Sequence, residues 1–219
     1  MATTSTCIFD MDGVLIDSGA HHRSAWRALL DELGVHPAEP EFWRLTIGRP
    51  AEEAVPLLLG RQMSSSEARR LALRKRDLYA GFAARGLLSV PGVAEFVRTL
   101  VRLGVPRAVG TSATRGDVEN LLGALALRPH FEIIVTAEDV RFGKPDPEVY
   151  LECAHRLGSP PAVCLVFEDS LVGVQAARRA GMRAIGVTTA HTAEELLDAG
   201  AEDTIADFEG LEWKSIARP

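Results

Sequence analysis

The stretch TCIFDMDGVLIDS, residues 6–18, decides the fold of this chain. Its first four residues form a short β-prone apolar run, which predicts a buried strand. The run ends at Asp10, and Gly13 permits the sharp departure of the chain that follows. Asp10 and Asp12 are two residues apart, so in extended backbone their side chains point the same way. The stretch therefore predicts a first strand that presents two carboxylates at its carboxyl end.

Four more apolar runs follow, and segments with helical periodicity separate them. The runs span residues 107–110, 133–135, 163–167 and 184–187. The helical segments span residues 92–103, 115–125, 147–157, 171–180 and 193–199. Four of these segments end in a glycine, at Gly104, Gly158, Gly181 and Gly200. Strands that alternate with helices in this way predict a parallel sheet.

Residues 18–85 interrupt the alternation of strands and helices. Only helical stretches are recognisable there, at residues 22–33, 51–59 and 66–84. Val90-Pro91-Gly92 then breaks the helix and restarts the alternating pattern. We therefore expect a core of residues 1–17 and 86–219 with an all-helical insertion of residues 18–85. The two chain crossings, near residues 17–19 and 82–91, are expected to form a hinge.

Composition and charge exclude several classes of protein. Apolar residues make up 47% of the 219 residues and charged residues 25%, as in ordinary globular chains. The formal net charge is −6 and the basic residues are scattered, so we expect no nucleic-acid partner. No apolar run reaches the ~18 residues of a membrane span, and residues 1–6 lack the order of a signal peptide. We expect a cytoplasmic monomer without membrane contact, in which the isolated Cys7, Cys153 and Cys164 are buried free thiols.

Three later segments place further polar residues at the ends of predicted strands. The segment GTSA, residues 110–113, offers hydroxyls and backbone N–H groups that could bind phosphate oxygens or cap the next helix. The segment FGKPDP, residues 142–147, holds Lys144 in a restricted turn that suits a positive charge beside a carboxylate. The segment EDS, residues 168–170, forms a second acidic cluster or a helix cap. Because parallel strand ends meet at one edge, all these segments should converge with Asp10.

The four polar segments resemble the four motifs of the haloacid dehalogenase superfamily. GVLIDS and GKPDP match the phosphatase and phosphomutase members, and the match spans nearly the whole chain. The resemblance implies a doubly wound, Rossmann-like α/β core with an all-helical cap inserted after the first strand. It points to the beta-phosphoglucomutase-like and sugar-phosphate phosphatase branch, with residues 1–17 and 86–219 as catalytic core and residues 18–85 as cap.

The resemblance also implies a role for each matching residue. Asp10 matches the nucleophile that forms an aspartyl-phosphate, and Asp12 matches the general acid and base. Thr111 and Ser112 match the phosphate-binding segment. Lys144 matches the lysine that orients the nucleophile and neutralises phosphate charge. The implied Mg²⁺ ligands are Asp10, the Asp12 backbone carbonyl, Glu168 and Asp169.

The chemistry of phosphate esters gives a physical reason for these residue types. A phosphate monoester repels an incoming carboxylate, so Mg²⁺ and Lys144 must cancel negative charge around Asp10. The leaving alkoxide needs a proton, which Asp12 can donate only if it is protonated while Asp10 is ionised. Two steps through Asp10 let Asp12 act first as acid and then as base. The sequence therefore predicts a Mg²⁺-dependent phosphatase that acts on a small phosphorylated metabolite such as a sugar phosphate.

The predicted cap carries three candidate substrate contacts, His22, Arg49 and Lys75. His22 and Trp26 resemble the H-x-x-x-W pattern of beta-phosphoglucomutases, and Lys75 resembles part of a basic pair on their cap helix. Trp26 could equally be a core residue, and Lys75 could belong to an exposed basic face. The loop of residues 47–51 lacks the lysine and arginine that a mutase cap uses to hold a second phosphate, so we favour hydrolysis.

Other functions stay open at this point. One is beta-phosphoglucomutase, which transfers a phosphoryl group between C1 and C6 of a hexose. Another is a non-enzymatic receiver-like phospho-acceptor module, which also places acids, a hydroxyl and a lysine at strand ends. Receiver modules are about half this length and carry no helical cap. A dehalogenase is a third option, but its chemistry needs neither Asp12 nor a magnesium cluster.

Overall fold

The computed structural model describes residues 5–38, 42, 45–47 and 49–217 of the chain. The chain forms two compact units, Met1–Asp17 with Leu88–Pro219 and Ser18–Leu87. The sequence predicts an insertion of residues 18–85, and the second unit of the structure ends at Leu87, close to the predicted end. That the second unit serves as a cap stays a prediction.

The first unit contains a six-stranded, all-parallel sheet. Its strands are β1 (Thr6–Phe9), β2 (Arg107–Gly110), β3 (Ile133–Val135), β4 (Cys164–Glu168), β5 (Arg183–Val187) and β6 (Asp203–Ile205), in the order β3-β2-β1-β4-β5-β6. Each neighbouring pair is parallel, with Ile8 opposite Ala108 on one side and Val166 on the other. The predicted parallel sheet is confirmed. Strand β6 is missing from the prediction because its residues, Asp203–Ile205, do not form an apolar run.

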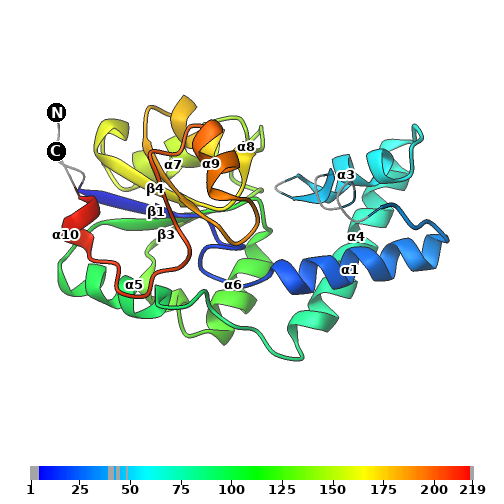
Figure 1. Ribbon diagram of the computed structural model, residues 1–219, viewed down its shortest axis with the longest axis horizontal. Coiled ribbons are helices and arrows are strands. Elements are labelled where there is room, and N and C mark those ends of the chain that lie inside the picture. Colours follow the sequence, from blue (N-terminus) through cyan, green and yellow to red (C-terminus); the bar gives the residue numbers. More distant parts are fainter. Residues whose placement is uncertain (1–4, 39–41, 43–44, 48, 218–219) are drawn as a thin grey trace. The chain divides into compact units, whose positions relative to one another are not determined.

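Helices cover both faces of this sheet, so that the first unit is a three-layer α/β structure (Figure 1). They are α5 (Val93–Arg102), α6 (Arg115–Ala124), α7 (Glu148–Arg156), α8 (Leu171–Arg179), α9 (Ala193–Asp198) and α10 (Trp213–Ile216). In Figure 1, α7, α8 and α9 lie above the sheet, while α5 and α6 lie below it. The glycines predicted to follow helices, Gly104, Gly158, Gly181 and Gly200, all have positive φ. The doubly wound architecture is confirmed.

The two faces of the sheet bury different side chains, because successive strand residues point to opposite faces. On one face, Ile8 belongs to a buried apolar cluster with residues of α7 and α8. On the other face, Phe9 stacks on Phe167 with 5.3 Å between ring centroids, and both contact Phe96 and Phe208. Burial of each ring stabilises the fold by roughly 1.5–3 kcal/mol. The strand ends are therefore held rigidly from both sides.

The second unit is built from helices. They include α1 (Gly19–Leu33), α3 (Ala51–Leu58) and α4 (Ser65–Ala83), and α4 packs against both of the others. The buried Trp26, Leu29 and Leu71 belong to one apolar cluster in this unit. Trp26 is thus a core residue, which was one of its two predicted roles. The side chain of Ser64 caps α4 by accepting a hydrogen bond from the Glu67 N–H.

Two further sequence predictions concern thiols and membranes. The three cysteines, Cys7, Cys153 and Cys164, are buried and free, as predicted. Burial raises the pKa of the Cys7 thiol well above its usual value. Among the helices in the described part of the chain, none has the length and apolar character needed to cross a membrane.

Candidate active site

The site lies where the strand order reverses, between β1 and β4. Connections leave these two neighbouring strands in opposite directions, which opens a crevice at their carboxyl ends. Asp10 follows β1 directly, and its N–H donates to the Phe167 carbonyl at 3.0 Å, so the β1–β4 ladder holds its backbone. Glu168 is the last residue of β4. Both carboxylates are buried, with exposed fractions of 7% for Asp10 and 1% for Glu168.

Lys144 joins these two carboxylates. Its Nζ donates to Asp10 Oδ1 at 2.6 Å, to Glu168 Oε1 at 2.6 Å and to the Gly110 carbonyl at 3.2 Å. The lysine is 9% exposed, so it differs from the solvated surface lysine that is common in proteins. The turn of residues 142–147 therefore brings a positive charge to the ends of β1, β2 and β4.

Glu168 is held by donors on both of its oxygens. Oε1 accepts from Lys144 and from the Tyr150 hydroxyl at 2.8 Å, while Oε2 accepts from the Ser170 N–H at 2.8 Å and its hydroxyl at 2.9 Å. A Cβ at Gly173 would lie 1.7 Å from Oε1, so only glycine fits there. Burial alone would raise the pKa of Glu168, but Lys144, Ser170 and Tyr150 lower it below the usual value. Glu168 is thus a fixed carboxylate.

Asp169 approaches the turn that follows β1. A Cβ at Gly13 would lie 1.9 Å from Asp169 Oδ2, and Gly13 has φ +72°, so this position needs glycine for two reasons. The Thr189 hydroxyl donates to the Gly13 carbonyl at 2.6 Å and lies 3.4 Å from Asp169 Oδ2. The loop after β5 therefore helps to hold the DxDG turn against Asp169.

The buried charges of this site do not balance within the protein. Burial raises the pKa of Asp10 to about 7, and the neighbouring Glu168 and Asp12 add to this rise while Lys144 opposes it. Burial and the neighbouring acids Glu168, Asp10 and Asp12 also raise the pKa of Asp169 well above its usual value. If Asp10, Glu168 and Asp169 were all ionised, three carboxylates would face the ammonium of Lys144. Two negative charges would remain, which is the charge that one divalent cation neutralises.

The geometry of the same three carboxylates suits a metal ion. Asp10, Glu168 and Asp169 each offer an oxygen, and these oxygens lie within 4.8 Å of one another. Oxygen ligands and a net deficit of two charges fit Mg²⁺ better than the transition metals that prefer imidazole or thiolate. These residues would hold the ion. Asp12 is half-buried in the turn after β1, and its role as a backbone ligand stays a prediction.

The predicted phosphate-binding segment follows β2 at the same edge of the sheet. Thr111 is 2% exposed, and its N–H donates to the Val135 carbonyl at 3.0 Å. Thr111 Oγ1 accepts from the Ala113 N–H at 3.1 Å, whereas Ser112 is exposed. The cap of α6 is Thr114, so the alternative that Thr111 or Ser112 caps this helix is wrong. For Ser170 the capping alternative is confirmed, because its hydroxyl accepts from the Gly173 N–H at 3.1 Å.

In the second unit, His22 and Lys75 lie together. Lys75 Nζ is 2.6 Å from His22 Nδ1 and 5.3 Å from the centroid of the Trp26 ring, and the lysine is 8% exposed. The alternative that Lys75 belongs to an exposed basic face is therefore wrong, because its ammonium turns inward over aromatic rings. Arg49 is exposed, and its neighbour Gly48 lies outside the described residues.

Two residues of the site escaped the sequence interpretation. Tyr150 resembles an ordinary core aromatic, since it lies on the buried face of α7. Its signal is the hydroxyl itself, because a buried tyrosine hydroxyl needs a polar partner. Thr189 lies two residues after the end of β5. A polar residue just after a strand end is a signal of a site residue, as it was for Thr111 after β2.

Comparisons with known proteins agree with this geometry. Residues 4–181 match the family of haloacid dehalogenase-like hydrolases. The chain is 35% identical over 216 residues to validoxylamine A 7'-phosphate phosphatase of Streptomyces hygroscopicus subsp. limoneus, covering 95% of this chain and 96% of that protein. It is 34% identical over 180 residues to fructose-1-phosphate phosphatase YqaB of Escherichia coli, covering 82% and 94%.

A solved structure extends the agreement to the fold. A HAD hydrolase of family IA, variant 3, from Entamoeba histolytica has a TM-score of 0.89 and 25% identity, with 97% of both chains covered. The chain belongs to the haloacid dehalogenase-like hydrolases. The resemblance drawn from its sequence motifs is confirmed, and so is the prediction of an enzyme.

Proposed function

We propose that this protein is a Mg²⁺-dependent phosphatase that hydrolyses a small phosphorylated metabolite through an aspartyl-phosphate on Asp10. The contact of Lys144 Nζ with both Asp10 and Glu168, at 2.6 Å each, carries the proposal. This contact supports the proposal because it joins the proposed nucleophile, a cation and a proposed metal-binding carboxylate at one strand-end crevice. A purely structural ion pair gives no reason for the further carboxylate of Asp169 within the same cluster.

Asp10 is the proposed nucleophile. Its backbone is fixed by the β1–β4 ladder and its Oδ1 by Lys144, so its second oxygen has a defined direction for in-line attack on phosphorus. When bound, Mg²⁺ supplies the positive charge that keeps this buried carboxylate ionised and reduces its repulsion with the phosphate. Lys144 shares this role, because burial alone would lower the pKa of its ammonium but Asp10 and Glu168 raise it above the usual value.

Asp12 is the proposed general acid and base. In the first step it donates a proton to the leaving alkoxide, and in the second step it removes a proton from the water that attacks the aspartyl-phosphate. Phosphate returns to solution and both aspartates return to their starting states. Thr111 and Ser112 are the proposed contacts of the phosphoryl oxygens, through a hydroxyl and the N–H groups ahead of α6.

A sugar phosphate is the proposed substrate class. Two relatives support this choice, since one is named for fructose 1-phosphate and the other for validoxylamine A 7'-phosphate. His22, Arg49 and Lys75 are the proposed contacts of the part of the substrate beyond the phosphate. The paired imidazole of His22 and ammonium of Lys75 offer hydrogen bonds to the hydroxyls of a sugar.

Phosphate release from a panel of phosphorylated metabolites, with Mg²⁺ and with chelator, tests the proposal. Wild-type protein should release phosphate only with the metal, and Asp10→Asn should be inactive with an unchanged circular dichroism spectrum. Activity of Asp10→Asn equal to that of the wild type would overturn the mechanism.

The same assay distinguishes the alternative functions. With beta-glucose 1-phosphate, a bisphosphate primer and Mg²⁺, a phosphatase accumulates free phosphate. Accumulation of glucose 6-phosphate instead would identify beta-phosphoglucomutase. Stable phosphorylation of Asp10 by a phosphodonor, without turnover of any ester, would identify a receiver-like module.

A further inference from the structure

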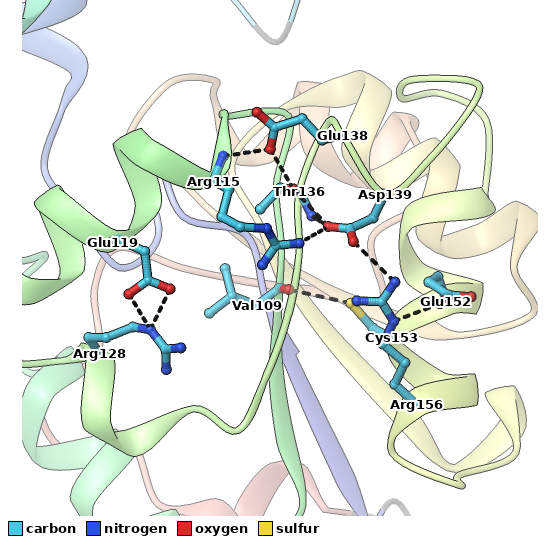
Figure 2. Close-up of polar contacts among 10 residues, drawn as sticks. All are labelled: Val109, Arg115, Glu119, Arg128, Thr136, Glu138, Asp139, Glu152, Cys153 and Arg156. Atoms are coloured by element: carbon cyan, nitrogen blue, oxygen red, sulfur yellow. Dashed lines mark hydrogen bonds and ion pairs between the residues drawn. The ribbon is translucent and has the colours of Figure 1, made fainter.

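A polar network joins the loop after β3 to the start of α6 and to α7 (Figure 2). It lies entirely within the first unit, and the mechanism above makes no use of it. Its centre is Asp139, whose side chain is 14% exposed. The residues around it, Thr136, Glu138, Arg115 and Arg156, come from three separate elements.

Asp139 accepts hydrogen bonds on both of its oxygens. Oδ2 accepts from the Thr136 N–H at 2.8 Å, the Thr136 hydroxyl at 2.7 Å and Arg115 Nη2 at 2.6 Å. Oδ1 accepts from Arg156 Nη2 at 3.2 Å. Burial alone would raise the pKa of Asp139, but Thr136 and the two arginines lower it, so the side chain is ionised at neutral pH. One carboxylate therefore fixes two guanidinium groups.

The segment of residues 111–114 is held against the end of β3 and the loop that follows it. At its first residue, the Thr111 N–H donates to the Val135 carbonyl at 3.0 Å. At its third, the Ala113 carbonyl accepts from the Ala137 N–H at 3.1 Å. Directly after it, the Arg115 N–H donates to Glu138 Oε2 at 2.8 Å and the Arg115 side chain reaches Asp139. Removal of Asp139 would release the Arg115 side chain at this end of the segment, while the backbone contacts with Ala137 and Glu138 would remain.

The network also connects the segment to α7. Arg156 bridges Asp139 and Glu152, the latter through Nε to Oε1 at 2.6 Å, and Cys153 Sγ lies 3.5 Å from the Val109 carbonyl of β2 (Figure 2). Helix α7 carries Tyr150, which holds Glu168. The helix is therefore fixed to the same strands and loops as the catalytic groups.

We propose that Asp139 is a positioning residue that holds the phosphate-binding segment, residues 111–114, at a fixed distance from Lys144 and Asp10. The inference rests on the proposed function, because it assigns phosphate binding to this segment. Loss of one hydrogen bond to a charged group typically weakens binding by about 10- to 100-fold, so a displaced segment would bind phosphate less tightly. Asp139 thus affects phosphate affinity without touching phosphate.

The test compares wild type with Asp139→Ala and Asp139→Asn. We expect the KM for the best phosphate ester and the inhibition constant of orthophosphate to rise together, by about 10- to 100-fold in Asp139→Ala. The value of kcat should change much less, since lost binding that is equal in ground and transition state raises KM alone. Asp139→Asn keeps the shape and the acceptor oxygen, so its effect should be smaller.

A control residue lies on α6, the helix that also carries Arg115. Glu119 of α6 accepts from Arg128 Nε at 2.8 Å and 2.9 Å, and this pair is drawn beside the network in Figure 2. Glu119→Ala removes a more exposed carboxylate–arginine contact that involves no residue of the segment 111–114. We expect a small loss of stability and unchanged KM and inhibition constants.

Two further measurements keep the outcome clear if Asp139→Ala folds poorly. Arg115→Ala should reproduce the rise in the orthophosphate constant, and the double variant should show no further rise, because both changes break one contact. Orthophosphate should also raise the melting temperature less in these variants than in the control.

The possible results distinguish the positioning role of Asp139 from the proposed phosphatase function. Orthophosphate constants of Asp139→Ala and Arg115→Ala equal to wild type would overturn the positioning role and leave the phosphatase intact. A wild-type protein that neither hydrolyses phosphate esters nor binds orthophosphate would overturn the proposed function, and this inference with it.

Discussion

Two lysines of this chain are buried to nearly the same extent, but their surroundings differ. Lys144 is 9% exposed and contacts the carboxylates of Asp10 and Glu168, whereas Lys75 is 8% exposed and contacts His22 and the rings of Trp26 and Tyr79. Burial alone therefore says little about what a lysine does. Lys144 is proposed to neutralise charge in the reaction site, whereas Lys75 is a proposed substrate contact whose ammonium lies over aromatic rings.

The largest expected effect is that of Lys144→Met. Loss of the ammonium leaves Asp10 and Glu168 buried without their shared partner, and breaking such a buried pair costs about 3–5 kcal/mol. Loss of a positioned charge at the reacting centre should also lower kcat by about 10²- to 10³-fold or more. Urea unfolding and steady-state kinetics measure the two effects. A stable and fully active Lys144→Met would contradict the role given to this lysine.

Metal removal should change how stability depends on pH. The folded-state pKa of Asp10 is raised from 3.8 to about 7, so the folded state holds a proton that the unfolded state has lost between these values. The free energy of unfolding of metal-free protein should therefore fall as pH rises from about 4 to about 7. The pKa of Glu168 is lowered in the folded state, so its contribution to stability is lost only as the pH falls below the usual value of 4.5.

Denaturation by urea at about pH 5 and about pH 8, with chelator and with Mg²⁺, measures this dependence. Mg²⁺ should stabilise the protein much more at the higher pH, because protons no longer compete for Asp10. Equal stabilisation by Mg²⁺ at both pH values would argue against Asp10 as a ligand.

Tyr150→Phe tests how Glu168, the carboxylate that Lys144 contacts, is held in place. The change removes only the hydroxyl that donates to Glu168 Oε1, while the ring beneath the Lys144 ammonium, 4.9 Å from its centroid, stays in place. Groups that orient metal-binding residues typically contribute about 10- to 100-fold, so the apparent Mg²⁺ affinity should fall by about tenfold. Titration of activity with Mg²⁺ gives the value. An unchanged midpoint would show that Lys144 and Ser170 suffice to hold Glu168.

The smallest expected effect is that of Lys75→Met, the same substitution at the second buried lysine. Replacing a buried ammonium with an apolar side chain of similar length is often neutral or stabilising, so the melting temperature should not fall. The KM for a sugar phosphate should rise by about tenfold, while hydrolysis of p-nitrophenyl phosphate should be unaffected. A loss of kcat on both substrates as large as that of Lys144→Met would remove the distinction between the two lysines.

The same comparison shows which features can be predicted from sequence. Asp10 and Glu168 could be predicted to converge because each stands at a strand end, and parallel strand ends meet at one edge. Lys144 could be predicted from its restricted turn, since it stands in the loop between β3 and α7. Tyr150 could not, because its hydroxyl partner Glu168 is 18 residues away and its helical position matches that of a core aromatic.

The inward direction of Lys75 had a signal in the sequence that was not used. Its adjacent residues Arg74 and Arg76 are charged, but helical periodicity places it on one stripe with the buried Leu71 and Tyr79. Its contacts with His22 and Trp26 depend on the packing of α1 on α4. Strand β6 was missed for another reason. Its three residues lack the apolar run by which the other strands were recognised, and the sheet edge tolerates this exposure.

Direct capture of the covalent intermediate tests the central claim best. Wild-type protein would be mixed with substrate and Mg²⁺, quenched in acid within milliseconds and digested for mass spectrometry. The proposed mechanism predicts one added phosphoryl group on the peptide that contains Asp10, absent in Asp10→Asn. Rapid release of phosphate by wild type with that peptide unmodified at every quench time would contradict it.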